Sequence, residues 1–403
     1  MINFDVVNDI PTTNKTIFLL TDLNVPLDEN GKIIDDEKIK KAMPTINYLV
    51  KTGARVVIAT HLGYPASEID LRFSTRPIAD YLNKRMHCNV NFTKDCIGEQ
   101  SKRDIFRTEY GDIIVLENLL FYKEEKNCDM NFARQLADGI NVYVNDSFEY
   151  SNFPYASVLA VPLFVRATGG LTLTNTIEQL NIFTSSTNKF TSAIIGGKNF
   201  SLKKNLLNNL VETTKCIIVV GEIANTFLYA INKKVGKSIY EKSQFDDVLK
   251  ILEKAKKNNC VIIMPEDVKT IKNLNQNSAI NKTIDEIEDD DIIIDIGAKT
   301  LDTAQSILDV SRCVFWYGNS GISEYKNANS STIELAETIT KLTKKKRIFS
   351  IVSGKDTILS LKTLNYLENF SFVSTSTEST LQYLSGKVLP GIEVLKRLSK
   401  QMV

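Results

Sequence analysis

The chain has 403 residues, of which 43% are hydrophobic and 24% are charged, and its 49 basic and 48 acidic side chains give a net charge of +1. This composition is typical of a globular protein with more than one core, and it excludes the disordered and fibrous classes. A net charge this close to zero creates no overall field that would attract nucleic acid or a membrane surface, so we expect neither as a partner.

The start of the chain lacks the pattern of a secretory signal, and no apolar run reaches the length of a membrane helix. We therefore expect a cytoplasmic protein. The six cysteines form no Cys-x-x-Cys pair, which predicts reduced, structural thiols. The only two histidines are His61 and His87, which excludes a histidine-based zinc site.

Short β-branched apolar runs recur along the chain with amphipathic stretches between them, a pattern typical of parallel sheets covered by helices on both faces. In the first part, the predicted strands are 17–20, 55–60, 113–116 and 142–144. In the second part, they are 193–195, 217–220, 261–264, 292–294, 314–316, 348–352 and 370–373. The pattern predicts an α/β protein with two doubly wound, Rossmann-like parallel-sheet domains.

The spacing of the strands changes at Thr168-Gly169-Gly170, where a helix-like segment over 171–183 leads into a polar run. We interpret this segment as a hinge helix between the domains. The expected organisation is an N-terminal domain over 1–168, an interdomain helix and linker over 169–190, a C-terminal domain over 191–383 and a terminal segment over 384–403.

A polar pair follows the first predicted strand, where Asp22 and Asn24 precede Pro26. Ligands of open α/β sheets bind outside the carboxyl ends of the strands, so this pair is a candidate for a catalytic or binding role. The same residue types also cap helices and fix loops without any ligand, and that alternative remains open.

Further motifs follow the other predicted strands in turn. They are Thr60-His61-Leu62-Gly63, Leu116-Glu117-Asn118-Leu119-Leu120-Phe121, Val144-Asn145-Asp146-Ser147-Phe148, Ile195-Gly196-Gly197, Ala224-Asn225-Thr226-Phe227-Leu228, Asp295-Ile296-Gly297, Gly354-Lys355-Asp356-Thr357 and Leu384-Ser385-Gly386-Lys387. In this order and spacing, together with Asp22-Leu23-Asn24-Val25-Pro26, the motifs resemble the phosphoglycerate kinase family over essentially the whole chain.

The resemblance implies a two-domain hinge enzyme of glycolysis that acts as a monomer and whose terminal segment returns to the N-terminal domain. It implies phosphoryl transfer between 1,3-bisphosphoglycerate and ADP, with 3-phosphoglycerate on a basic patch of the N-terminal domain and Mg-ADP or Mg-ATP on the C-terminal domain. Such transfer depends on positioning and on cationic stabilisation, so the positive charges decide the activity.

On the phosphoglycerate side, the resemblance assigns substrate binding to Asp22, Asn24, Lys38 and His61, with Lys38 also catalytic. Lys38 replaces an arginine of the family and lacks its planar fork. The other basic positions of the family are replaced here by Leu20, Tyr64, Leu120, Asn152, Phe153 and Tyr155. The sequence therefore predicts that the basic patch is largely lost. Leu20, Leu120, Phe153 and Tyr155 are candidates for an apolar lining in its place. Two interpretations of this face remain open, namely that it filled in after selection for the substrate was lost, or that it forms a site for a new partner or ligand.

On the nucleotide side, the resemblance makes Lys203 catalytic and Asp356 the magnesium ligand. The nucleotide-binding positions that it implies are Gly197, Lys203, Gly221, Gly297, Gly318, Glu324, Gly354, Asp356 and Thr357. The transfer-site lysine of the family is Asn199 here. A shift of one residue would let neighbouring Lys198 take its place, but adjacent side chains at a strand end point in opposite directions, which argues against this alternative. The family's glycine triplet is Ser376-Thr377-Glu378.

Three functions remain open from the sequence. The first is a divergent phosphoglycerate kinase with weak or lost activity. The second is a pseudoenzyme that acts as a binding or regulatory scaffold, with an unidentified protein partner, and the losses at both substrate sites favour it. The third is an enzyme for a different, less anionic substrate, which fits the apolar replacements.

Overall fold

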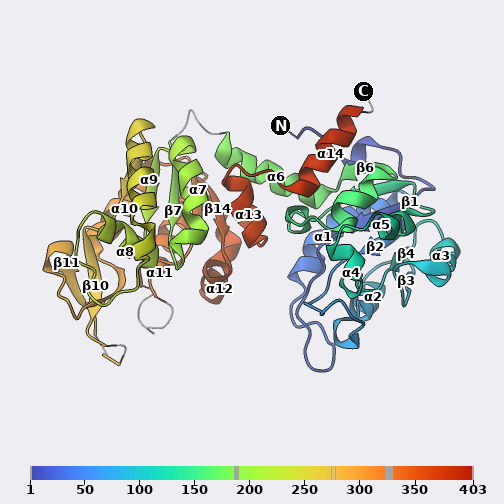
Figure 1. Cartoon of the computed structure of the whole chain (residues 1–403), viewed down its shortest axis with the longest axis horizontal. Coiled ribbons are helices and arrows are strands. Elements are labelled where there is room, and N and C mark those ends of the chain that lie inside the picture. Colours follow the sequence, from blue (N-terminus) through green and yellow to red (C-terminus); the bar gives the residue numbers. More distant parts are fainter. Residues whose placement is uncertain (1, 186–189, 274, 277, 323–329, 402–403) are drawn as a thin grey trace. The chain divides into compact units, whose positions relative to one another are not determined.

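The computed structural model describes residues 2–185, 190–273, 275–276, 278–322 and 330–401 (Figure 1). The chain divides into two compact units, of which unit 1 contains Met1–Glu178 and Val388–Val403 and unit 2 contains Gln179–Lys387. Each unit is built on a six-stranded parallel sheet. The fold class predicted from the strand pattern is therefore confirmed.

The sheet of unit 1 has the strand order β3-β4-β2-β1-β5-β6. Its strands are β1 (Thr16–Leu20), β2 (Arg55–Ala59), β3 (Val90–Phe92), β4 (Ile113–Val115), β5 (Val142–Asn145) and β6 (Arg166–Gly169). The helices of unit 1 are α1 (Glu37–Lys51), α2 (Arg76–Asn83), α3 (Gly98–Arg107), α4 (Lys123–Lys126), α5 (Met130–Ala137) and α14 (Pro390–Gln401).

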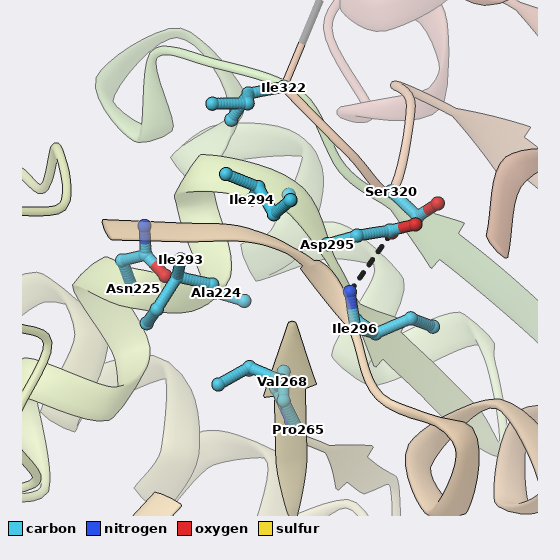
Figure 2. A pocket seen from close by; sticks show the side chains of 11 residues that line it. Ala224, Asn225, Pro265, Val268, Ile293, Ile294, Asp295, Ile296, Ser320 and Ile322 are labelled. Atoms are coloured by element: carbon cyan, nitrogen blue, oxygen red, sulfur yellow. Dashed lines mark hydrogen bonds between the residues drawn. The ribbon is translucent and has the colours of Figure 1, made fainter. Parts of the chain in front are cut away.

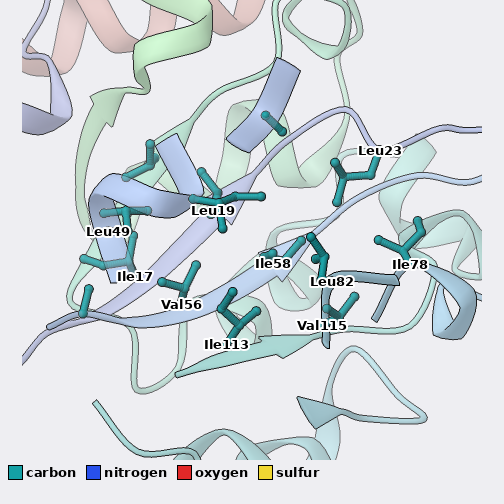
Figure 3. Packing of buried hydrophobic residues seen from close by; sticks show 14 of the residues in the cluster. Ile17, Leu19, Leu23, Leu49, Val56, Ile58, Ile78, Leu82, Ile113 and Val115 are labelled. Atoms are coloured by element: carbon teal, nitrogen blue, oxygen red, sulfur yellow. The ribbon is translucent and has the colours of Figure 1, made fainter. Parts of the chain in front are cut away.

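The central strand β1 shows why its sequence reads as a continuous apolar run. All five of its residues are buried. Ile17 and Leu19 join a cluster with Val56 of β2 and Leu49 of α1 on one face of the sheet (Figure 3). Phe18 is also fully buried, and its ring stacks on Tyr143 of β5. A parallel strand with no solvent-facing side has no need for alternating polar residues.

The main sheet of unit 2 has the order β15-β14-β13-β7-β8-β9. Its strands are β7 (Thr191–Ile195), β8 (Cys216–Val219), β9 (Val261–Ile263), β13 (Cys313–Tyr317), β14 (Phe349–Ser353) and β15 (Phe372–Ser374). The helices of unit 2 are α7 (Phe200–Thr213), α8 (Gly221–Ala230), α9 (Phe245–Lys257), α10 (Ala298–Val310), α11 (Ser330–Lys344), α12 (Lys355–Thr363) and α13 (Thr377–Leu384).

Unit 2 also contains a small antiparallel sheet with the order β11-β10-β12. It consists of β10 (Asp267–Ile271), β11 (Ile280–Thr283) and β12 (Ile292–Ile296), and β10 pairs antiparallel with both neighbours. The sequence placed the run 292–294 among the parallel strands, and that expectation is wrong. An apolar β-branched run fits either kind of sheet, because the pairing partner decides the direction.

Helix α6 (Leu171–Thr184) begins in unit 1, and the division between the units falls within it. Its first turn is capped by buried Asp146, whose Oδ1 accepts hydrogen bonds from the backbone N–H groups of Thr172 (2.8 Å) and Leu173 (3.3 Å). Burial raises the pKa of Asp146 to about 7. Across the described ranges of the chain, no helix has both the length and the apolar character needed to span a bilayer.

Candidate functional site

The first group of predicted site residues lies at the carboxyl end of β1. Leu20, the last residue of this strand, is fully buried. In the loop that follows, Asp22 Oδ1 accepts the backbone N–H of Asn24 at 3.0 Å, and Asn24 Oδ1 accepts the backbone N–H of Gly63 at 2.9 Å. Asp22 and Asn24 therefore fix their own loop and tie it to the loop after β2.

Lys38 and Asp22 form an ion pair across this loop. Lys38 lies in the first turn of α1, and its Nζ is 2.7 Å from Asp22 Oδ2. The hydroxyl of Tyr150 donates to the other oxygen, Asp22 Oδ1, at 3.1 Å. Because both carboxylate oxygens are engaged, the charge of Lys38 is compensated by its own neighbour, although a third of its side chain is exposed.

His61 points into the interior of unit 1. Its side chain is 3% exposed, and its Nε2 lies 2.8 Å from Oε1 of Glu125, which is completely buried. Glu125 also accepts hydrogen bonds from the backbone N–H and the hydroxyl of Ser157, at 3.0 and 2.5 Å. The rings of Tyr150 and Tyr155 pack against the imidazole. His61 is therefore already held by a hydrogen bond and by ring packing within unit 1.

The side chains at the replaced basic positions of unit 1 differ in how deeply they are buried. Leu20 and Leu120 are buried with the core. Phe153 and Tyr155 are half-buried, and their rings stack with centroids 5.2 Å apart. Tyr64 is 86% exposed. Of the four side chains expected to form an apolar lining, Phe153 and Tyr155 form a stacked, half-buried pair, whereas Leu20 and Leu120 belong to the core.

The second group of predicted residues surrounds a cavity of about 240 Å³ in unit 2. The cavity lies at the carboxyl ends of β7, β13 and β14, where the parallel strands give way to α7, to the loop after Tyr317 and to α12. Its lining includes Gly197, Lys198, Asn199, Lys203, Glu222, Tyr317, Gly318, Asn319, Gly354, Lys355, Asp356 and Thr357. This is the position at which open α/β sheets bind ligands.

Lys203 is the most buried cation of this cavity. It lies on α7 and is 6% exposed, and its ammonium group donates a short hydrogen bond to the backbone carbonyl of Lys198. The same group lies 5.5 Å from the ring centroid of Tyr317. Burial lowers the pKa of Lys203 to about 8, against the opposing effect of nearby carboxylates.

Lys198 and Asn199 both line the cavity. Strand β7 ends at Ile195, and Asn199 has a left-handed backbone with φ of +59° directly before α7. The alternation of side chains holds only within an extended strand, and it ends where the backbone turns. The ammonium of Lys198 lies 3.6 Å from Oε1 of Glu222.

Asp356 and Thr357 stand in the first turn of α12. The Thr357 hydroxyl is buried and accepts the backbone N–H of Gly318 at 2.8 Å, so it stabilises the cavity wall. Asp356 is exposed and lies between exposed Lys355 and Thr357. Burial, Asp356 and Glu378 together raise the pKa of Tyr317 to about 12. An exposed carboxylate at the mouth of a cavity is suited to a hard cation such as Mg²⁺.

A second, narrower cavity lies between α8 and the small antiparallel sheet, and its empty space of about 10 Å³ suits a single water molecule. Figure 2 shows aliphatic side chains around it, including Ile293, Ile294 and Ile322. Asn225 also lines it, and its buried Oδ1 has no hydrogen-bond partner. Ile322 lines both cavities, so the two cavities are neighbours at that residue.

The comparison with known families decides the ancestry of these two strand-end groups. The family model for phosphoglycerate kinase matches residues 7–387. The chain belongs to the phosphoglycerate kinase family. The phosphoglycerate kinase of Wolbachia pipientis wMel is 36% identical over 396 residues, which cover 98% of this chain and 99% of that protein. The one from Methylorubrum extorquens (strain PA1) is 33% identical over 399 residues, with 98% and 99% covered.

Solved structures agree with this membership. The phosphoglycerate kinase of Coxiella burnetii superimposes with a TM-score of 0.91 at 31% identity, and the match covers 98% of this chain and all of that one. The enzyme of Pyrococcus horikoshii OT3 gives a TM-score of 0.78 at 24% identity, with 99% and 100% covered, and shares the fold.

Not every nucleotide-binding position implied by the resemblance to phosphoglycerate kinase is found in the lining of the polar cavity. Gly297 precedes α10, and its backbone N–H donates to the carbonyl of Asp267 at 2.9 Å, so it joins this helix to the small sheet. Glu324 lies outside the described residues. The other predicted positions on the nucleotide side fall on the cavity wall or, like Gly221, on the wall of the neighbouring, narrower cavity.

Sequence reasoning missed the partners that compensate the phosphoglycerate-side residues. Glu125 pairs with His61, and the hydroxyl of Tyr150 donates a hydrogen bond to Asp22. Glu125 lies a few residues after the Leu-Glu-Asn motif, and Tyr150 lies a few residues after Asn145-Asp146, so both stood close to phosphoglycerate kinase motifs. That proximity was the only available signal, because neither residue type indicates a partner by itself.

Proposed function

We propose that unit 2 binds Mg-ADP or Mg-ATP, and that unit 1 binds 3-phosphoglycerate too weakly for efficient phosphoryl transfer between 1,3-bisphosphoglycerate and ADP. One observation carries this proposal. Lys38 and His61, the basic groups retained on the phosphoglycerate side, are already paired with Asp22 and Glu125. The protein would then be a phosphoglycerate kinase with strongly reduced turnover, working as a cytoplasmic monomer.

The nucleotide side has the residues that the proposal needs. The Lys203 ammonium lines the cavity and would neutralise phosphate oxygens there. Asp356 offers an exposed carboxylate beside Lys203, and it fits Mg²⁺, which commonly binds one or two carboxylates together with substrate phosphates. The metal would supply positive charge to the phosphates. Lys198 lines the same cavity and could provide the cation that Asn199 lacks, once it separates from Glu222.

The phosphoglycerate side lacks the charges that a phosphate needs. Charge-assisted hydrogen bonds contribute about 1.5–3 kcal/mol each, so four missing cations would weaken binding by about 6 kcal/mol or more, which is about four orders of magnitude. In addition, an anion would have to compete with Asp22 for Lys38. These two effects act in the same direction.

A scaffold without turnover is the second candidate function. It is favoured by the completeness of the internal pairing in unit 1, where both oxygens of Asp22 and of Glu125 accept hydrogen bonds from the protein itself. Such a site is stable without a substrate. A nucleotide bound in unit 2 would then stabilise the scaffold by mass action without being consumed.

Calorimetry with Mg-ADP and, separately, with 3-phosphoglycerate tests the proposal, together with a turnover assay coupled to glyceraldehyde-phosphate dehydrogenase. We expect measurable Mg-ADP binding, no 3-phosphoglycerate binding at micromolar concentrations, and turnover that is slow but above background. Micromolar binding of 3-phosphoglycerate would overturn the proposal. Nucleotide binding with no turnover would favour the scaffold, and the absence of binding by both ligands would exclude any kinase function.

A further inference from the structure

A groove in unit 1 carries a separate inference that does not depend on the proposed function. It encloses about 870 Å³ between α2 and the loop formed by residues 30–36. The described residues that line it do not include Asp22, Asn24, Lys38 or His61. The groove is therefore distinct from the strand-end residues on the phosphoglycerate side.

The groove follows the length of α2. On the helix, Arg76 and Asp80 share one face and Pro77 and Tyr81 share another, because residues four apart lie on the same face. Lys84, the C-cap, and Arg85, in the turn after it, continue this wall. At 1.5 Å per residue, the eight residues of α2 extend over about 12 Å. That length corresponds to about four residues of an extended peptide at about 3.3 Å per residue. The shape therefore suits an extended segment better than a compact small molecule.

The charge of the groove is positive. Arg76, Lys84, Arg85 and Lys32 line it, and no carboxylate lies within ion-pair distance of any of them among the described residues. The guanidinium of Arg85 stacks on the ring of Tyr81 at 3.7 Å, and that of Arg76 lies 5.3 Å from the ring centroid of Phe92. Stacking orients a guanidinium and leaves its N–H groups available for a carboxylate.

Two carboxylates also line the groove, but only one of them opposes an anion. Asp36 accepts hydrogen bonds from Tyr81 at 2.5 Å and from Lys40 at 2.8 Å, and these contacts, led by Lys40, lower its pKa. Its negative charge is therefore already compensated. Asp80 remains, so the groove presents four cations against one free carboxylate.

Apolar side chains stand exposed beside these cations. Leu71 is 78% exposed and Ile34 is 67% exposed, and both line the groove, with half-buried Ile33 next to them. Exposed aliphatic side chains grouped at a groove usually mark a contact surface, whereas a site for a small phosphorylated molecule would not need them. The combination favours a ligand that carries both carboxylates and aliphatic side chains.

We propose that this groove binds an extended acidic peptide segment of a partner protein, with carboxylates on Arg76, Lys84 and Arg85 and aliphatic side chains on Ile34 and Leu71. The cations supply steering and orientation, and the apolar contacts supply part of the affinity. Binding at the groove is independent of nucleotide and of phosphoglycerate.

Fluorescence polarisation with a labelled octapeptide that alternates glutamate and leucine tests this proposal on the full chain. We expect a Kd of about 100 µM or lower at low ionic strength, weakened by added salt, and no binding of the matched lysine–leucine peptide. The double variant Arg76→Glu/Lys84→Glu should weaken binding at least about tenfold. Lys94→Glu/Arg107→Glu, which changes two exposed cations of unit 1 outside the groove, is the matched control.

The apolar contribution is tested separately with Ile34→Ser/Leu71→Ser, which alters two exposed side chains and is expected to weaken binding about three- to tenfold while the melting temperature stays unchanged. The proposal is overturned if the glutamate–leucine peptide does not bind, or if the groove and control charge variants bind it alike. It is also overturned if the serine variant binds like wild type and inorganic phosphate displaces the peptide at constant ionic strength, because the groove would then be a site for small anions.

Discussion

The two units share an architecture, but they differ in whether the charged side chains at their strand ends are paired within the protein or exposed to a ligand. In unit 1, Lys38 and His61 are paired with Asp22 and Glu125, and the pairs are partly or wholly buried. In unit 2, exposed Asp356 lies at the wall of a cavity of about 240 Å³. Charges that have partners within the fold stabilise it, whereas the exposed carboxylate of Asp356 is accessible to a ligand. Retained residue types alone do not distinguish these cases.

The largest expected effect concerns unit 1, where the charged side chains are paired within the fold. Glu125→Ala removes the acceptor of His61 and of two Ser157 donors and leaves them buried without a partner. We expect a loss of about 3–5 kcal/mol in the free energy of unfolding, measured with urea. The control Glu109→Ala, at an exposed position, should change it by less than about 0.5 kcal/mol. Equal stability of the two variants would show that the pair contributes little.

The next effect concerns the polar cavity of unit 2, where Asp356 is exposed. Asp356→Asn should lower the affinity for Mg-ADP about 10- to 100-fold, because it removes the carboxylate proposed to hold the metal, while binding of ADP without magnesium should stay the same. Calorimetry with and without Mg²⁺ measures both. Asp302→Asn, at an exposed position of α10, is the matched control. A similar loss without magnesium would mean that Asp356 does not act through the metal.

A gain of function would sharpen the comparison. Tyr64 is 86% exposed, so Tyr64→Arg adds a cation at a lost basic position without disturbing the core. One charge-assisted hydrogen bond should raise the affinity for 3-phosphoglycerate about tenfold, as measured by calorimetry. Tyr64→Gln, which adds no charge, should give no gain. If the arginine gives none either, loss of charge at this position does not account for weak binding.

The smallest effect is a pH dependence of Mg-ADP binding to the polar cavity of unit 2. The pKa of Lys203 is lowered to about 8, so its ammonium is present below that pH and is lost as the pH rises through it. We expect Mg-ADP affinity to fall by up to about tenfold between pH 7 and 9. Lys203→Met should bind more weakly and show a flatter profile in the same calorimetric titration. Parallel profiles for both proteins would exclude Lys203 as the titrating group.

The architecture could be predicted because the buried parallel strands have a distinctive pattern. The run that forms β1 is apolar along its whole length, and this reflects burial on both faces. The run 292–294 has the same composition, and its placement in an antiparallel sheet depends on β10, whose mixed sequence Asp267–Ile271 gave no signal. Composition reveals burial, but it does not reveal which neighbour a strand pairs with.

The sequence named candidate residues at the strand ends, but it did not reveal their contacts. The motifs identified Asp22 and His61, but their partners Tyr150 and Glu125 lie 128 and 64 residues away along the chain. Such pairings arise from the fold, so local spacing cannot indicate them. The argument from strand alternation does not extend to Lys198 and Asn199, because β7 ends at Ile195 and Asn199 has a left-handed backbone.

The glycines around the polar cavity have a consequence for how such proteins change over time. Gly318 has φ of +94°, and a Cβ there would come within 2.1 Å of the backbone oxygen of Gly196. The ends of β7 and β13 thus touch through their main chains, and any side chain at Gly318 would force them apart. Selection for a foldable chain alone would preserve this glycine. Gly318 would therefore persist in a lineage that had stopped using the cavity, so its presence records descent and is not by itself a sign of use.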